Sequence, residues 1–96
     1  MVAKPKVHKP WLPVDYELAD AAAIQALQRG DADESQQKRA LDWIVNKACG
    51  TYDQSYYPGA DDGRRDTDFA EGRRFVGNTL VKMTRLSLGE MRRKET

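Results

Sequence analysis

Residues 68–83 read DFAEGRRFVGNTLVKM, and their spacing decides the expected fold. Apolar side chains recur along one helical face of this stretch: Phe69, Val76, Leu80 and Met83, with Gly72 on the same side. Asp68 and Glu71 are spaced like a capping box, so we expect a helix that begins at Asp68, with a cap at one of residues 66–68. We expect Phe69, Gly72 and Val76 to face inward.

The same stretch contains GRRFVGNT (residues 72–79), which has the glycine spacing of a phosphate loop. Asn78 stands where such a loop needs lysine, and no strand pattern precedes it. The segment is therefore predicted to be helical. Glycine inside a helix costs about 1 kcal/mol relative to alanine, so Gly72 and Gly77 are expected where another segment approaches closely.

Two further helices precede this one. Residues 35–49 carry an apolar stripe at helical spacing: Ala40, Leu41, Ile44, Val45 and Ala48. Asp33 or Ser35 is expected to start that helix. Residues 15–29 are rich in alanine, the best helix former, and Gly30 should end them. Residues 51–66 are expected to be a tyrosine-containing loop with a Pro58-Gly59 turn.

These patterns predict an all-α fold: a small three-helix domain over residues 14–92, with a basic arm at 1–13 and a tail at 93–96. Its third helix is expected to run from Asp68 to about Arg92. The length of 96 residues fits one domain, and the net charge of +1 gives no general affinity for nucleic acid. No apolar run has the length of a membrane span, and residues 1–13 lack the apolar segment of a signal peptide. We expect a cytosolic protein without membrane contact.

Catalytic, metal and cofactor sites are not expected. Cys49 and His8 are the only residues of their types, and His8 lies in the proline-rich arm, so a Cys-His pair is disfavoured. The acidic residues of 61–71 do not have the spacing of a calcium-binding loop. Cys49, at the end of an apolar stripe, is expected to be a buried structural residue.

The arm has three lysines that could reach nucleic acid: Lys4, Lys6 and Lys9. Such short basic ends are also common on proteins that bind no nucleic acid. Trp11 is the only large aromatic residue beside the prolines of the arm. We expect its ring to be well buried and to hold the arm on the helical body.

The order ALDWIVNKACGTYDQSYYPG (residues 40–59) and then DFAEGRRFVGNTLVKM resembles the Bbp-nineteen-like family of small tailed-phage proteins. The resemblance covers about residues 40–86. It implies a non-enzymatic protein encoded among virion and head-assembly genes, found in the host cytoplasm or in the virion. Many family members carry another GRR element before the cysteine helix, where this chain reads GDADESQQKRALDW (residues 30–43).

The resemblance implies a virion structural or head–tail assembly accessory that acts through protein contacts, either as a single chain or as an oligomer. The alternatives are a small DNA-binding protein and an inhibitor of a host protein. Tyrosine and arginine are enriched at the energetic centres of protein interfaces. The expected protein-binding residues are therefore Tyr52, Tyr56, Tyr57, Arg64, Arg65, Arg73 and Arg74. Among them, Arg73 is expected to brace the tyrosine loop and Arg74 to remain free for a partner.

Overall fold

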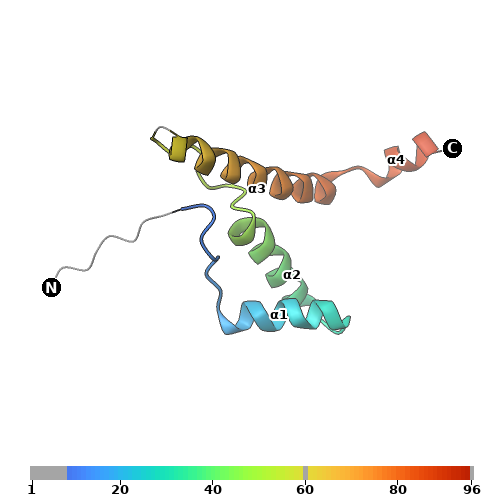
Figure 1. The fold of residues 1–96 in the computed structure, drawn as a ribbon. Coiled ribbons are helices and arrows are strands. Elements are labelled where there is room, and N and C mark those ends of the chain that lie inside the picture. The colour runs from blue at the N-terminus through green and yellow to red at the C-terminus, as the bar shows by residue number, and fades with distance from the viewer. Residues whose placement is uncertain (1–8, 60, 96) are drawn as a thin grey trace.

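The computed structural model describes residues 9–59 and 61–95. All regular secondary structure in these residues is helical, and they contain no strand. The all-α prediction is confirmed. The elements are α1 (Leu18–Arg29), α2 (Glu34–Asp42), the π-helical segment η1 (Trp43–Ala48), α3 (Asp61–Arg85) and α4 (Leu88–Glu95). The α2–η1 helix leads from α1 to α3, which crosses its end, and α4 extends away from the body (Figure 1).

The first two helices begin and end through local hydrogen bonds. A reciprocal capping box between Glu17 and Asp20 starts α1 at Leu18, so the prediction of a start at Asp15 is wrong. Gly30, with φ of 81°, ends α1 as predicted. The Asp33 side chain accepts a hydrogen bond from the backbone N–H of Gln36, which confirms Asp33 as the start signal of α2.

The contact between α1 and α2 is made of small side chains. Ala23 and Ala26 of α1 and Ala40 of α2 are all at most 1% exposed. Alanine lets two helix backbones approach closely but removes little apolar surface from water. The core of this domain is therefore thin, and its packing stabilises the fold by less than a core of leucine or phenylalanine would.

The end of the second helix is wider than a regular α-helix. The N–H of Cys49 donates to the carbonyl of Ile44, five residues earlier, at 2.9 Å. Both the N–H and the hydroxyl of Thr51 then donate to the carbonyl of Val45, at 3.2 and 2.6 Å. This π-helical turn replaces the regular helix predicted to Cys49, and it aims Cys49 and Thr51 at α3.

Helix α3 begins at Asp61, so the predicted start at residues 66–68 is wrong and the loop is shorter than expected. Gly63 explains the earlier start, because a Cβ there would lie 2.8 Å from the backbone of Pro58. Glycine thus lets the first turn of α3 pack directly beneath the loop. Thr67, proposed as a cap, instead accepts a hydrogen bond from the backbone N–H of Tyr57 at 2.9 Å.

The predicted continuous third helix is also interrupted. It stops at Arg85, and α4 starts at Leu88 after a break at residues 86–87. Ser87 caps the new helix, because its hydroxyl oxygen accepts from the N–H of Glu90 at 3.3 Å. Helix α4 reaches Glu95, so residues 93–95 belong to a helix and not to a separate tail.

The inward face of α3 lies about 100° around the helix from the one predicted, because the buried residues Ala70 and Gly77 each follow a predicted inward residue by one position. Gly63, Ala70 and Gly77, spaced by seven residues, are buried, whereas Phe69 and Val76 are about half exposed. A Cβ on Gly77 would collide with Thr51 Oγ1 and would lie 2.9 Å from Cys49 Cβ, while one on Gly72 would meet nothing within 4 Å. The backbone of η1 and its loop lies so close to α3 that only small residues fit between them.

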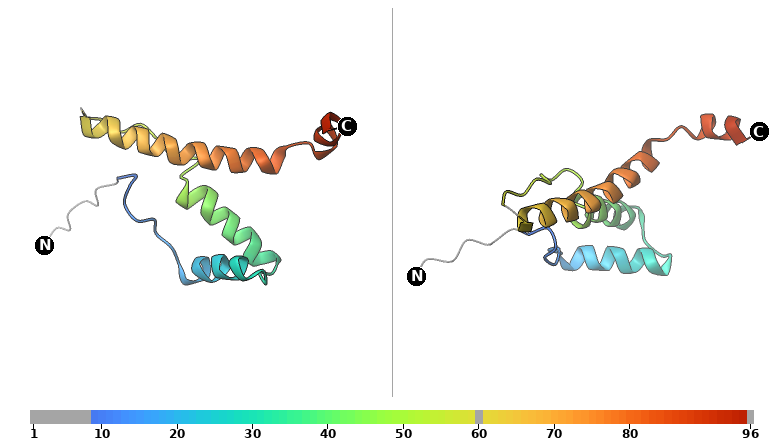
Figure 2. Two further views of the ribbon diagram at one scale, coloured as in Figure 1. Left: turned by 45° about the vertical axis from the view of Figure 1, so that its right-hand side comes forward. Right: turned by 45° about the horizontal axis from the view of Figure 1, so that its top comes forward.

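The described part of the chain is elongated (Figure 2). Its radius of gyration is 17.3 Å and its extents are 60 × 33 × 16 Å. A compact domain of this length would have a radius of gyration of about 12–13 Å. The chain therefore has a large surface for a small core, and much of the surface contributed by its large apolar residues stays in contact with solvent.

Candidate protein-interaction surface

The arm is held on α3 by a buried carboxylate. Asp66 is only 4% exposed. Lys9 Nζ donates to its Oδ2 at 2.7 Å, and Trp11 Nε1 donates to its Oδ1 at 3.0 Å. The hydrogen bond from Lys9 lowers the pKa of Asp66, and the same contact raises the pKa of Lys9. We call the contacts of Lys9, Pro10 and Trp11 with α3 the arm clamp.

The clamp corrects the prediction about Trp11 and gives Lys9 a partner within the chain. The ring of Trp11 is 56% exposed, whereas Pro10 is fully buried, so the arm docks through Pro10 and two polar contacts more than through a buried indole. Lys9, expected as a nucleic-acid contact, is engaged with Asp66. Lys4 and Lys6 lie outside the described residues.

Arg73 and Arg74 have roles different from those predicted. Arg73 Nη1 donates to the carbonyl of Pro10 at 2.9 Å, so this side chain belongs to the arm clamp. Arg74 Nε donates to the carbonyl of Thr51 at 3.1 Å and its Nη1 approaches Glu71 at 3.4 Å. Arg74 therefore braces the loop and is not free for a partner, while Arg73 braces the arm.

Gly50 is what allows Arg73 to reach the arm. Its φ is 55°, and a Cβ at this position would lie 2.5 Å from Arg73 Nη2. Both the backbone conformation and the close approach favour glycine. The Cys-Gly pair in the sequence thus marks a point where the chain turns and a guanidinium group passes over it.

The tyrosine loop presents two rings to solvent. Tyr52 and Tyr56 are 69% and 65% exposed. The loop is held from below: Ser55 Oγ donates to the carboxylate of Glu71, which lowers the pKa of that group, and Tyr57 is bonded through its backbone to Thr67. A shaped loop with outward rings is suited to contact a protein surface.

Arg64 and Arg65 are exposed on the first turns of α3. They follow Gly63, which packs against the backbone of Pro58 in the loop. Of the seven residues predicted for protein binding, these two and the exposed tyrosines are on the surface. Tyr57, Arg73 and Arg74 are half-buried and shape the surface from within. We call Tyr52, Tyr56, Arg64 and Arg65 the loop surface.

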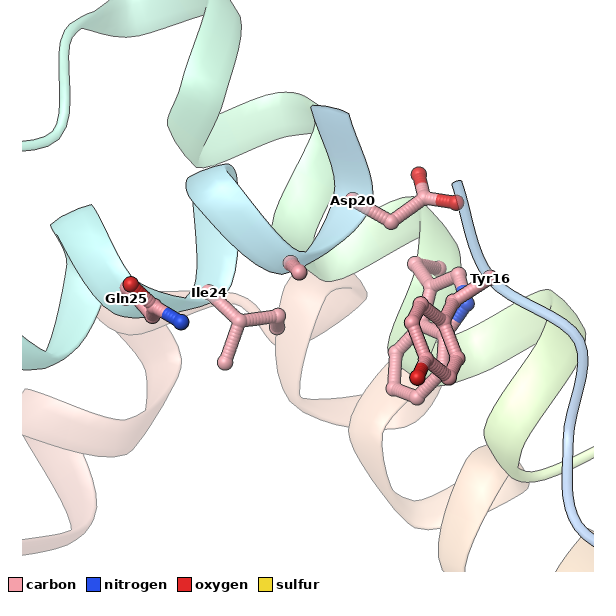
Figure 3. A pocket seen from close by; sticks show the side chains of 6 residues that line it. Tyr16, Asp20, Ile24 and Gln25 are labelled. Carbon is pink, nitrogen blue, oxygen red and sulfur yellow. The ribbon is translucent and has the colours of Figure 1, made fainter. Parts of the chain in front are cut away.

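A hollow of about 320 Å³ lies between α1 and the start of η1. Figure 3 shows it with Tyr16 and Ile24 on its sides. Trp43 completes the wall and is held by a hydrogen bond from its Nε1 to the carbonyl of Asp15 at 3.1 Å. The lining is largely apolar and suited to an apolar side chain. Sequence reasoning missed it, although the position of Trp43 off its helical stripe was a signal.

Arg39 fixes the geometry of that hollow. It donates from Nε to Asp20 at 2.8 Å and from Nη2 to Glu17 at 3.1 Å, and so ties α2 to the first turn of α1. The backbone N–H of Glu17 and then Arg39 lower the pKa of Asp20. These contacts are exposed, so each contributes little to stability by itself.

Three further observations bear on chemistry. Cys49 is buried against α3, as predicted for a structural residue. Among residues 9–59 and 61–95, no group of His, Cys, Asp and Glu side chains is arranged to hold a metal ion. None of the helices in the described part of the chain has the length and apolar character needed to cross a membrane.

Comparisons with protein-family models, curated proteins and solved structures found no significant match to this chain. The resemblance of residues 40–86 to a phage family therefore remains a prediction from the sequence. The segments that carry the resemblance contact one another in the structure. The GRR segment lies within α3, and its arginines contact the Cys-Gly turn and the start of the tyrosine loop.

Proposed function

We propose that this chain is a phage-encoded, non-enzymatic accessory protein, a virion structural or head–tail assembly component that acts through contacts with other proteins. The observation that carries the proposal is the exposure of large apolar side chains around a core made mostly of alanine. These exposed residues are spread over the arm, α1, the loop, α3 and α4: Trp11, Tyr16, Leu18, Tyr52, Tyr56, Phe69, Phe75, Val76, Met83 and Leu88.

The energetic reason is the imbalance between exposed and buried apolar surface. Burial of apolar area stabilises by about 25 cal/mol per Å², and a chain of this length has little stability to spare. Large exposed apolar patches on a small protein mark contact sites. A chain whose aromatic side chains are exposed to solvent is stabilised when another protein buries them.

The loop surface is the part proposed to meet the other assembly protein. It combines two exposed tyrosine rings with Arg64 and Arg65, and the bonds of Arg74 and Thr67 fix its shape before binding. A fixed loop loses little conformational entropy when it binds, which favours affinity.

The test has two steps. Purified particles of the phage that encodes the chain are analysed by mass spectrometry, and the double variant Tyr52→Ala/Tyr56→Ala is then compared with the wild type for incorporation. Leu27→Ala, which removes an exposed apolar side chain of α1 outside both the hollow and the loop surface, is the control. We expect the double variant to lose incorporation and the control to keep it. Particles that never contain or require the chain would overturn the proposal, and recovery of the chain only with a host protein would favour an inhibitor.

A further inference from the structure

One face of α3 carries an apolar stripe that is about half exposed or more in the described part of the chain. Phe69, Val76 and Met83, spaced by seven residues, are 48%, 51% and 62% exposed, and Phe75 beside them is 70% exposed. The side of α3 away from α2 faces no other described helix (Figures 1 and 2). A Cβ on Gly72, within the stripe, would also meet nothing within 4 Å.

The spacing of this stripe matches a helix–helix seam. Apolar residues that repeat every seven positions keep facing a partner helix when two helices wind around each other. Phe69 to Met83 covers 14 residues, or about 21 Å of helix. Gly72 lies one turn after Phe69 on the same side and leaves room for a large side chain from the opposite helix.

Charge along α3 is divided between its ends. Residues 61–71 contain five acidic and two basic residues, while residues 75–89 contain Lys82 and Arg85 and no acidic residue. Two copies that run in opposite directions would place each acidic end beside the basic end of the other. Parallel copies would bring like ends together, which is unfavourable.

The residues beside the stripe agree with that orientation. Asp68, Phe75 and Lys82 each precede a stripe residue by one position, and all three are exposed. In an antiparallel pair that crosses near Phe75, Asp68 of one copy meets Lys82 of the other, twice by symmetry, and the two Phe75 rings meet at the centre. Val76 is then level with residue 74 of the opposite copy and packs between that copy's Gly72 and Val76.

We propose that this surface binds a second copy of the chain, as an antiparallel α3–α3 pair centred on Phe75 and Val76. The pairing does not rest on the proposed role in phage assembly, because Phe69, Val76 and Met83 belong neither to the arm clamp nor to the loop surface. The loop surface consists of other residues: Tyr52, Tyr56, Arg64 and Arg65.

The first experiment is analytical ultracentrifugation of the full chain over a concentration series at low salt. We expect the mass to rise from 10.9 kDa toward twice that value. Val76→Glu, which places a charge in the seam, should stay at the monomer mass. Asn78→Glu, the same charge on an exposed position of α3 outside the stripe, should behave as wild type. Circular dichroism checks that both variants are folded.

The second experiment tests the orientation by a charge swap. Asp68→Lys and Lys82→Asp should each weaken the dimer roughly tenfold, because each creates two like-charge contacts. The double variant Asp68→Lys/Lys82→Asp should return close to wild-type affinity. A monomer at all concentrations, a dimer insensitive to Val76→Glu, or a swap without rescue would each overturn the antiparallel pairing.

Discussion

Replacement of Gly77 by alanine should destabilise the domain, although the same change normally stabilises a helix. Alanine gains about 1 kcal/mol over glycine in a helix interior. At Gly77, however, the new methyl group would collide with Thr51 Oγ1 and would lie 2.9 Å from Cys49 Cβ. Neither neighbour can move easily, because both side chains are buried: Thr51 is 1% exposed and Cys49 is 7% exposed. The hydroxyl of Thr51 also donates to the carbonyl of Val45 at 2.6 Å.

The magnitude follows from these terms. Overpacking in a close-packed site costs about 1–3 kcal/mol, and displacement of the Thr51 hydroxyl adds the net value of a hydrogen bond, about 1 kcal/mol. After the helix-propensity gain of Gly77→Ala is subtracted, the expected loss is about 1–3 kcal/mol. For a domain of this size that lowers Tm by roughly 5–20 °C.

Thermal unfolding followed by circular dichroism is the assay, with Gly72→Ala as the control on the same helix. A Cβ on Gly72 meets nothing within 4 Å, so this variant should be up to about 1 kcal/mol more stable than wild type. Gly77→Ala should cost less in a Thr51→Ala background, because the colliding hydroxyl is gone. If Gly77→Ala melts at or above the wild-type temperature, the close approach of η1 to α3 is wrong.

Three other changes test the arm and its turn. Hydrogen bonding holds the pKa of Asp66 below its usual 3.8 and that of Lys9 above 10.5, so the pair stabilises the fold at neutral pH. Asp66→Asn should therefore lower Tm at neutral pH. The difference in Tm should begin to shrink as pH falls below about 3.8, and it should vanish only below the lowered pKa of Asp66 in the folded protein. Trp11→Ala should cost well under the 3–5 kcal/mol of a buried tryptophan, because the ring is 56% exposed, and a larger loss in urea unfolding would contradict that exposure. Gly50→Ala should cost about 1–2 kcal/mol through its left-handed backbone and should displace Arg73; unchanged stability in the same assay would refute the turn.

Helix existence was predictable because it depends on local spacing. The cap at Asp33, the stop at Gly30 and the positive φ of Gly59 all follow from short-range chemistry. Helix α3 was the difficult case, because its apolar stripe predicts a helix but does not show which side of that helix packs against the rest of the chain. The small residues at Gly63, Ala70 and Gly77 repeat with the same period, and only the contact with the loop decides which stripe lies inside.

The contacts that shape the candidate surface could not be predicted, because they join distant parts of the chain. Nothing local indicates that Asp66 is bonded to Lys9 and Trp11 or that Arg73 reaches Pro10. Helical angles alone placed Arg73 toward the loop and Arg74 toward solvent. The backbone carbonyls that accept from these guanidinium groups belong to the arm and to the loop, whose paths depend on the whole fold.

The arm clamp makes the chain a non-covalent ring. Lys9 and Asp66 are 57 positions apart, so their contact encloses both α1 and α2 in one closed loop. Closing a flexible segment of that length costs on the order of 3–4 kcal/mol of chain entropy, more than one charged hydrogen bond of about 1.5–3 kcal/mol can offset. Lys9, Pro10 and Trp11 must therefore act together, and the ring should open in one step when enough of its contacts are lost. In a chain with a single cysteine, such a polar fastening takes the place of a disulfide and, unlike one, it can be released by acid.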